Sequence, residues 1–156
     1  MSKVKDKVCI VISKGTLDMA FPPFMIATSA AAMDMEVHLY FTFWGMDIIT
    51  KKKSGKLKLA PIGNPSLPMP NILGILPGMT AMVTKMIKSK MKKSEMPSIQ
   101  ELIKMAKDGG VIFHACSPTM KLMGTTKDDL IPEVDDVIGA ATYVDLAKEA
   151  TITLFI

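Results

Sequence analysis

The chain has 156 residues, of which 49% are hydrophobic and 22% charged, and its formal net charge is +4. This length predicts one domain with a sizeable core, and no apolar run reaches the ~18 residues of a membrane-spanning helix. With two cysteines and no segment typical of a signal peptide, we expect a reducing, cytoplasmic location. The high hydrophobic content also predicts a homo-oligomer, in which a subunit interface buries apolar surface.

Lysine supplies all 19 basic residues, and ten of these lie in residues 48–94, which contain no aspartate or glutamate. The nine lysines elsewhere face 15 acidic residues, so an acidic domain carries a basic insert. Two interpretations remain open: a solvated surface, or a docking face for an anionic protein or for peripheral contact with an anionic membrane. Nucleic acid is a less suitable partner, because bidentate contacts to phosphate and guanine favour arginine.

The first half of the chain begins with a strand–helix–strand pattern. Residues 7–13 form a short β-branched run that is typical of a buried parallel strand. Residues 17–33 have apolar and small residues at helical spacing, with a proline pair at 22–23 either in the first turn or at a kink. Residues 36–44 predict a second strand, which ends at Gly45.

Residues 50–95 predict a Lys/Met-rich insert. Its Pro- and Gly-rich stretch, 51–77, predicts a loop with one short strand at 57–60. Residues 79–93 predict a helix with methionine, valine and isoleucine on one side and lysine mainly on the other. The apolar side either packs on the sheet or a second subunit, or is a docking surface for an acidic partner or an anionic membrane. We expect the insert to lie near the edge of the sheet that carries Cys116.

The second half of the chain continues the alternation of strands and helices. Ser98 and Glu101 have the spacing of a capping box at the start of a helix. The predicted elements are a helix at 98–107, a strand at 111–116, short helices at 118–123 and 127–130, a strand at 134–138, a helix at 140–150 and a strand at 152–156. This order predicts a single domain over residues 1–156 with a three-layer α/β fold, in which about five mostly parallel strands carry helices on both faces.

Cys116 is the candidate functional residue, because it lies at the carboxyl end of a predicted strand, where open α/β sheets bind ligands. Ser117 suits the N-cap and Pro118 the first position of the helix that follows. Unpaired N–H groups and the helix dipole would then stabilise a thiolate. From the pattern alone, a reactive thiol and a small buried hydrophobe both remain open. Cys9, in the middle of a strand, is expected to be buried.

The available residues narrow the chemistry of a reactive Cys116. A metal site needs several ligands within reach, and the chain has only two histidines, so no metal or other cofactor is predicted. Papain-like catalysis needs a partnered base and a third, orienting group, which the sequence does not indicate. A peroxidase thiol of the peroxiredoxin kind uses an arginine, and the chain has none. A thiol that holds and passes a sulfane sulfur atom needs one nucleophilic cysteine and a partner thiol on another protein.

The DsrE/DsrF-like family, in particular its DsrE-type sulfur-carrier branch, is similar to this chain in four segments: residues 18–49, 76–93, 114–124 and 139–150. The most specific pieces are the sequences FTFWG at 41–45 and CSPTMKLMG at 116–124. Members of this branch are sometimes called peroxiredoxin family proteins, a name that the missing arginine argues against. The resemblance implies a flavodoxin-like fold, a homo-oligomer and a cytoplasmic role in sulfur metabolism.

For the site, the resemblance implies that Cys116 holds sulfur as a persulfide or a thiosulfonate. The partners it implies are TusA-like sulfur carriers and rhodanese-type sulfurtransferases. We expect Ser117 and the backbone N–H groups of Thr119 and Met120 to stabilise the sulfur anion. Four further side chains are pocket candidates, three from neighbouring strand-end loops and one from the strand of Cys116 itself: Thr16, Asp18, Trp44 and His114. The alternative is a non-catalytic interaction module that scaffolds a complex through the Lys/Met-rich insert.

Overall fold

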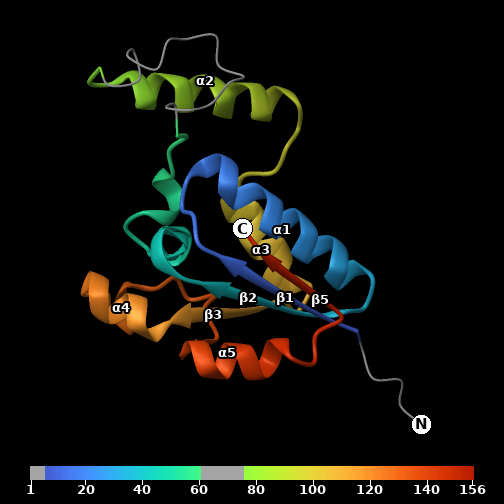
Figure 1. The fold of residues 1–156 in the computed structure, drawn as a ribbon. Helices are drawn as coiled ribbons and strands as arrows, with labels where there is room; N and C mark the ends of the chain where they lie inside the picture. Colours follow the sequence, from blue (N-terminus) through green and yellow to red (C-terminus); the bar gives the residue numbers. More distant parts are fainter. Residues whose placement is uncertain (1–5, 61–75) are drawn as a thin grey trace.

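The computed structural model describes residues 6–60 and 76–156, and Figure 1 shows how the elements are arranged. The strands in this part of the chain are β1 (Lys7–Ile12), β2 (Glu36–Phe41), β3 (Ile112–Cys116), β4 (Asp136–Ile138) and β5 (Ile152–Phe155). The α-helices are α1 (Leu17–Ala32), α2 (Met79–Lys93), α3 (Ile99–Asp108), α4 (Ser117–Met123) and α5 (Ala140–Ala147). Short 3-10 helices lie in the loops as η1 (Phe43–Ile49), η2 (Ser54–Lys56) and η4 (Lys127–Asp129).

The sheet is parallel at every strand pair, in the order β4-β3-β2-β1-β5. Helices α1 and α3 cover one face and α5 covers the other (Figure 1). Crossover helices of this kind bury both faces of a parallel sheet, which explains why β1 is a nearly continuous apolar run. The predicted three-layer α/β fold is therefore confirmed, and its arrangement is flavodoxin-like.

The main core lies between the sheet and helices α1 and α3. Three fully buried rings meet there, with centroids 5.5–6.2 Å apart: Phe24, Phe41 and Phe113. A smaller cluster on the other face contains Tyr40, Cys116 and Ile138, packed against Tyr143 and Leu146 of α5. Because side chains of a strand alternate between faces, Phe41 points to the first cluster and Tyr40 to the second. Cys116 therefore faces the thinner, α5 side of the sheet.

Of the two positions expected for the prolines at 22–23, the structure excludes the first turn, because both lie inside α1, where Pro23 is buried beside Phe24. One local prediction in the first half of the chain is wrong. Strand β2 ends at Phe41, three residues earlier than predicted. The reason is the backbone of Phe43, whose φ of 46° is left-handed and cannot continue a strand.

The strand predicted at 57–60 is also absent from the described residues. Leu57 and Leu59 are buried and their neighbours exposed, which is the alternation that a strand would show. The backbone groups have other partners, however. The carbonyl of Lys58 accepts from Leu17 N–H at 2.8 Å, and Leu59 N–H donates to the Thr84 hydroxyl at 3.1 Å. The segment is thus a loop that is hydrogen-bonded to α1 on one side and to α2 on the other.

The Lys/Met-rich insert contains the predicted helix, α2, with the predicted bounds, while residues 61–75 lie outside the described residues. Val83 of α2 is buried in the main core, and Figure 1 shows α2 beyond α1, away from α5. The bond from Leu17 to Lys58 places the insert at the carboxyl end of β1. The insert therefore lies at the expected end of the sheet, but α2 is on the opposite face from Cys116.

Candidate functional site

Cys116 is the last residue of β3 and the N-cap of α4. Sequence reasoning gave the N-cap to Ser117, one residue too late; Ser117 is the first helical residue and Pro118 the second. Only 5% of the Cys116 surface is exposed, although the residue stands at the carboxyl end of the sheet. Its thiol therefore lies just below the surface at the place where ligands of open α/β sheets bind.

A cluster of hydroxyl groups surrounds the sulfur. Thr119, one turn into α4, donates from Oγ1 to Cys116 Sγ at 3.2 Å. The same Thr119 oxygen lies 3.2 Å from Oγ1 of Thr42 and accepts from the backbone N–H of Phe43 at 3.1 Å. The hydroxyls of Thr42 and Tyr40, from the end of β2, also act on the thiol and favour its ionised form. The end of one strand, β2, and one helix, α4, therefore supply donors to a single sulfur.

These donors change the acidity of the thiol. Burial raises the pKa of Cys116, but the hydrogen bonds from Thr119, Thr42 and Tyr40 favour the thiolate and together bring the pKa below its ordinary value. Cys9, fully buried in the middle of β1, has the opposite outcome, because burial raises its pKa and nothing offsets that effect fully. The two cysteines thus differ as predicted in position, and the structure adds a difference in acidity.

The FTFWG turn, residues 41–45, presents Thr42 to the thiol, and Tyr40 directly precedes it in β2. Phe43 is held in a left-handed conformation, which costs a bulky residue on the order of 1–3 kcal/mol. Gly45 packs so closely on β1 that a Cβ atom there would lie 2.1 Å from the carbonyl oxygen of Ile12. Gly15 meets the Trp44 carbonyl in the same way, also at 2.1 Å. These two glycines allow the turn to pack directly on the end of β1. The close packing explains why the motif ends in glycine at position 45.

Of the three residues predicted to stabilise the sulfur anion, only Thr119 has a hydrogen bond to the sulfur in the described part of the chain. Thr119 contacts the sulfur through its hydroxyl and its backbone. The side chain of Met120 packs into the main core instead. Ser117 Oγ faces Gly139 at the end of β4, 3.8 Å from where a Cβ atom would be. A role for the Ser117 hydroxyl or the Met120 N–H at the sulfur remains a prediction.

Two of the predicted pocket residues, Thr16 and Asp18, lie at the start of α1, after the end of β1. Thr16 is the N-cap of α1 and lines a hollow with four lysines of the insert: Lys52, Lys53, Lys56 and Lys58. Asp18 Oδ1 is buried without a hydrogen-bond partner in the described part of the chain. Trp44, in η1 after β2, is 62% exposed. Their participation in the site stays a prediction.

His114 has partners of its own. Its Nε2 lies 2.8 Å from Nδ1 of His38, and its Nδ1 lies 2.5 Å from Oδ1 of Asp136. Both ring nitrogens are thus committed within the sheet. Sequence reasoning missed His38, Tyr40 and Thr42. The signal was available, because alternation puts residues 36, 38, 40 and 42 on one face and the carboxyl ends of parallel strands meet.

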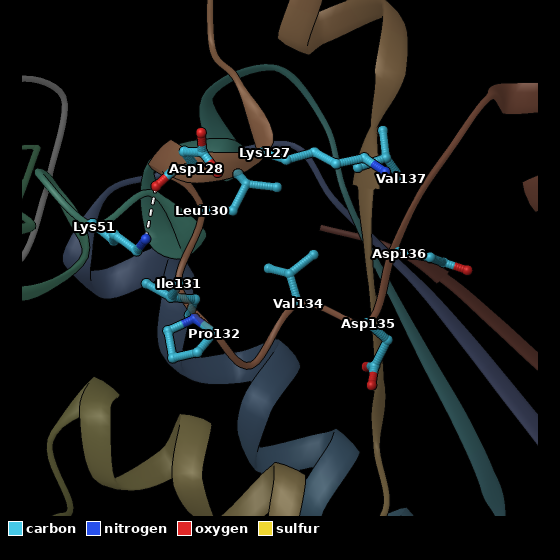
Figure 2. Close-up of a pocket in the computed structure, with 10 residues that line it drawn as sticks. All are labelled: Lys51, Lys127, Asp128, Leu130, Ile131, Pro132, Val134, Asp135, Asp136 and Val137. Carbon is cyan, nitrogen blue, oxygen red and sulfur yellow. Dashed lines mark hydrogen bonds between the residues drawn. The ribbon is translucent and has the colours of Figure 1, made fainter.

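The hollow shown in Figure 2 has a volume of about 280 Å³ and lies under the loop from η4 to β4, not at Cys116. Lys51 Nζ donates to the Asp128 carbonyl across it at 2.7 Å. Asp136 points away from this hollow in Figure 2, consistent with its bond to His114. Residues 6–60 and 76–156 contain no group of three or more side chains suited to a metal ion. In the same residues, no helix is long and apolar enough to cross a membrane.

A model of the DsrE/DsrF/DrsH-like family matches residues 4–155. The chain belongs to this family. It is 40% identical over 158 residues to the sulfur carrier protein DsrE2 of Allochromatium vinosum, a match that covers 96% of this chain and 98% of that protein. It is 33% identical over 166 residues to the uncharacterized protein YrkE of Bacillus subtilis, over the full length of both. The resemblance seen in the sequence is therefore confirmed.

Two solved structures have a similar fold at low sequence identity. The MTH1491 protein of Methanobacterium thermoautotrophicum, whose function is unknown, has a TM-score of 0.51 and 13% identity, with 96% of this chain and 99% of that chain covered. The ychN protein of E. coli has a TM-score of 0.52 and 11% identity, with 97% and 99% covered. These matches support the fold.

Proposed function

We propose that this protein is a sulfur carrier that holds sulfur on Cys116 as a persulfide or thiosulfonate and passes it to a thiol of another protein. The observation that carries the proposal is the hydroxyl cluster at the sulfur, which lowers the pKa of the thiol despite its burial. The thiolate is the nucleophilic form of cysteine. The likeness to the sulfur carrier protein DsrE2 supports the same function.

For a persulfide, loading and release are then two thiol exchange steps. In loading, the Cys116 thiolate attacks the outer sulfur of a donor persulfide; the donor S–S bond breaks, a new S–S bond forms on Sγ, and the donor leaves as a thiolate. In release, an acceptor thiolate attacks the outer sulfur and Cys116 leaves as a thiolate. One S–S bond replaces another in each step, so no further oxidant or reductant is needed. Thr119, Thr42 and Tyr40 stabilise the leaving thiolate.

The finer features of the proposal follow from the sequence. Since Cys9 is buried in the middle of β1, the acceptor thiol comes from another molecule, and TusA-like carriers and rhodanese-type sulfurtransferases are the proposed partners. We also propose a homo-oligomer in the cytoplasm. Exposed apolar side chains on the edge strand and α5, Ile152, Phe155 and Val144, support an oligomer.

A transfer experiment tests the proposal. The protein is incubated with an inorganic polysulfide, freed of the donor, and mixed with an acceptor thiol such as glutathione. We expect wild type and Cys9→Ser to lose the bound sulfur in step with its appearance on the acceptor, while Cys116→Ser carries none to transfer. Uptake without release to any thiol would contradict a carrier function.

A second candidate function is that of an interaction module that acts through α2. Met82 is 58% exposed and Met86 46% exposed on α2, among lysines, although the opposite side of the helix is buried at Val83 and Thr84. Flexible methionine side chains adapt to partner surfaces. We would measure sulfur transfer by a Met82→Gln, Met86→Gln double variant. Normal transfer to glutathione with loss of transfer to a protein acceptor would show that the protein combines both functions.

A further inference from the structure

A continuous row of ionisable side chains crosses three strands on the α5 face. Glu36 Oε1 lies 2.7 Å from His38 Nε2, His38 Nδ1 lies 2.8 Å from His114 Nε2, and His114 Nδ1 lies 2.5 Å from Asp136 Oδ1. The two histidines are 4% and 3% exposed. Their ring planes are within 9° of parallel, and an N–N distance of 2.8 Å is shorter than the ~3.5 Å at which ring faces touch. The rings therefore meet edge to edge.

With both carboxylates ionised, the hydrogen-bond geometry determines the number of protons in the row. Each carboxylate accepts from the imidazole nitrogen next to it, which places one proton on His38 Nε2 and one on His114 Nδ1. The two inner nitrogens need one proton between them: with none, two lone pairs would face each other at 2.8 Å, and with two, N–H would face N–H. Three protons on four ring nitrogens give the pair a single positive charge.

The neighbouring charges support this count. The groups that face the pair are Lys7 and Cys9 on β1, Glu36 and Tyr40 on β2, Cys116 on β3, Asp136 on β4, and Tyr143 on α5. Lys7 Nζ lies 3.4 Å from Glu36 Oε1. The pair lies between the carboxylates of Glu36 and Asp136, whose side chains are 41% and 50% exposed. Lys7 contacts both Glu36 and Glu149. A positive charge on the pair therefore lies between two groups of opposite charge.

The row lies directly before the site. His38 is two residues before Tyr40, and His114 two residues before Cys116, so all four side chains are on one face. The bond between the two rings joins β2 to β3 two residues before Tyr40 on β2 and Cys116 on β3. The Tyr40 hydroxyl in turn favours the Cys116 thiolate. We propose that His38 and His114 hold one shared proton and act as positioning residues, which keep Tyr40 within hydrogen-bond reach of the Cys116 thiolate.

The proton count can be measured directly. The chain has two histidines, so every imidazole signal of the untagged protein comes from this pair. Long-range ¹⁵N–¹H correlation spectra near pH 7 should show two outer nitrogens of the N–H type and two inner nitrogens at shifts between bare and protonated values. Spectra of two neutral rings, with the third proton on a carboxyl group or absent, would overturn the proposal, as would two fully protonated rings.

The positioning role rests on the function proposed above, whereas the proton count does not, so the two can fail separately. His114→Gln puts an amide where Nε2 was, which keeps a hydrogen bond to His38 without the shared proton. We expect Cys116 in His114→Ala, which loses the bond between β2 and β3, to be alkylated several-fold more slowly than in wild type. His114→Gln should restore most of the rate, because its amide can bond to His38. Equal alkylation rates in wild type and His114→Ala, or no rescue by His114→Gln, would refute the positioning role.

Discussion

The Thr119 hydroxyl donates to Cys116 Sγ at 3.2 Å, and the two residues are three positions apart on the first turn of α4. The same oxygen accepts from the backbone of Phe43, so this side chain joins the helix after β3 to the turn after β2. The link is what turns a nearly buried cysteine into an acidic one, because burial alone raises the thiol pKa. The pair therefore carries the functional argument.

Replacing Thr119 by valine keeps the shape of the side chain and removes its hydroxyl. The pKa of Cys116 should rise, and alkylation by iodoacetamide at pH 7 should slow by about tenfold or more, since a hydrogen bond to a charged group contributes roughly 1.5–3 kcal/mol. Thr28→Val is the matched control, because its hydroxyl donates to the Phe24 carbonyl within α1. Equal alkylation rates in wild type and Thr119→Val would show that this hydroxyl does not activate the thiol.

The turn glycines can be tested through stability. In Gly45→Ala, the new Cβ atom would lie 2.1 Å from the Ile12 carbonyl oxygen, so β1 and the turn must move apart. We expect the free energy of unfolding in urea to fall by about 1–3 kcal/mol or more. Gly55→Ala is the control, since its nearest neighbour is the Gln100 side chain at 3.9 Å. A Gly45→Ala protein as stable as Gly55→Ala would contradict the close packing of the turn.

The two tyrosines predict how stability depends on pH. Burial raises the pKa of Tyr143 to about 12 and raises that of Tyr40 further, with a hydrogen bond to Cys116 adding to the second shift. A raised pKa means that the fold favours the neutral phenol. This contribution is complete below the ordinary tyrosine pKa of ~10 and is lost as pH rises toward the folded-state values. Urea unfolding should thus show stability falling above pH 10, less so in Tyr143→Phe; an equal decline in both proteins would argue against the burial effect.

The sequence predicts the sheet and the position of Cys116 because the signals are local. Val8–Ile12 and the run before Cys116 are apolar enough to be recognised as buried strands, and Ser98 with Glu101 marks the start of α3 by a capping box that the structure confirms. The end of β2 was predicted too late, because the left-handed Phe43 is imposed by the contact of its N–H with Thr119, 76 positions away. Aromatic residues otherwise favour strands.

The partners of the thiol were harder to predict because they come from another strand. Candidates next to Cys116 in sequence gave one direct contact, Thr119. Tyr40 and Thr42 required knowledge that β2 and β3 are neighbours and in which register. His114 was singled out for its place on the strand of Cys116, yet its nitrogens bind His38 and Asp136. A single sequence shows which face a side chain takes, but strand order decides what it meets.

The central claim is that Cys116 is the residue that takes up sulfur. The direct measurement is the intact mass of the native protein after incubation with tetrathionate or with an inorganic polysulfide, for wild type, Cys9→Ser and Cys116→Ser. The account predicts a thiosulfonate or persulfide adduct on wild type and Cys9→Ser, reversed by dithiothreitol, and no adduct on Cys116→Ser. An adduct that persists in Cys116→Ser, or no adduct on wild type, would contradict it.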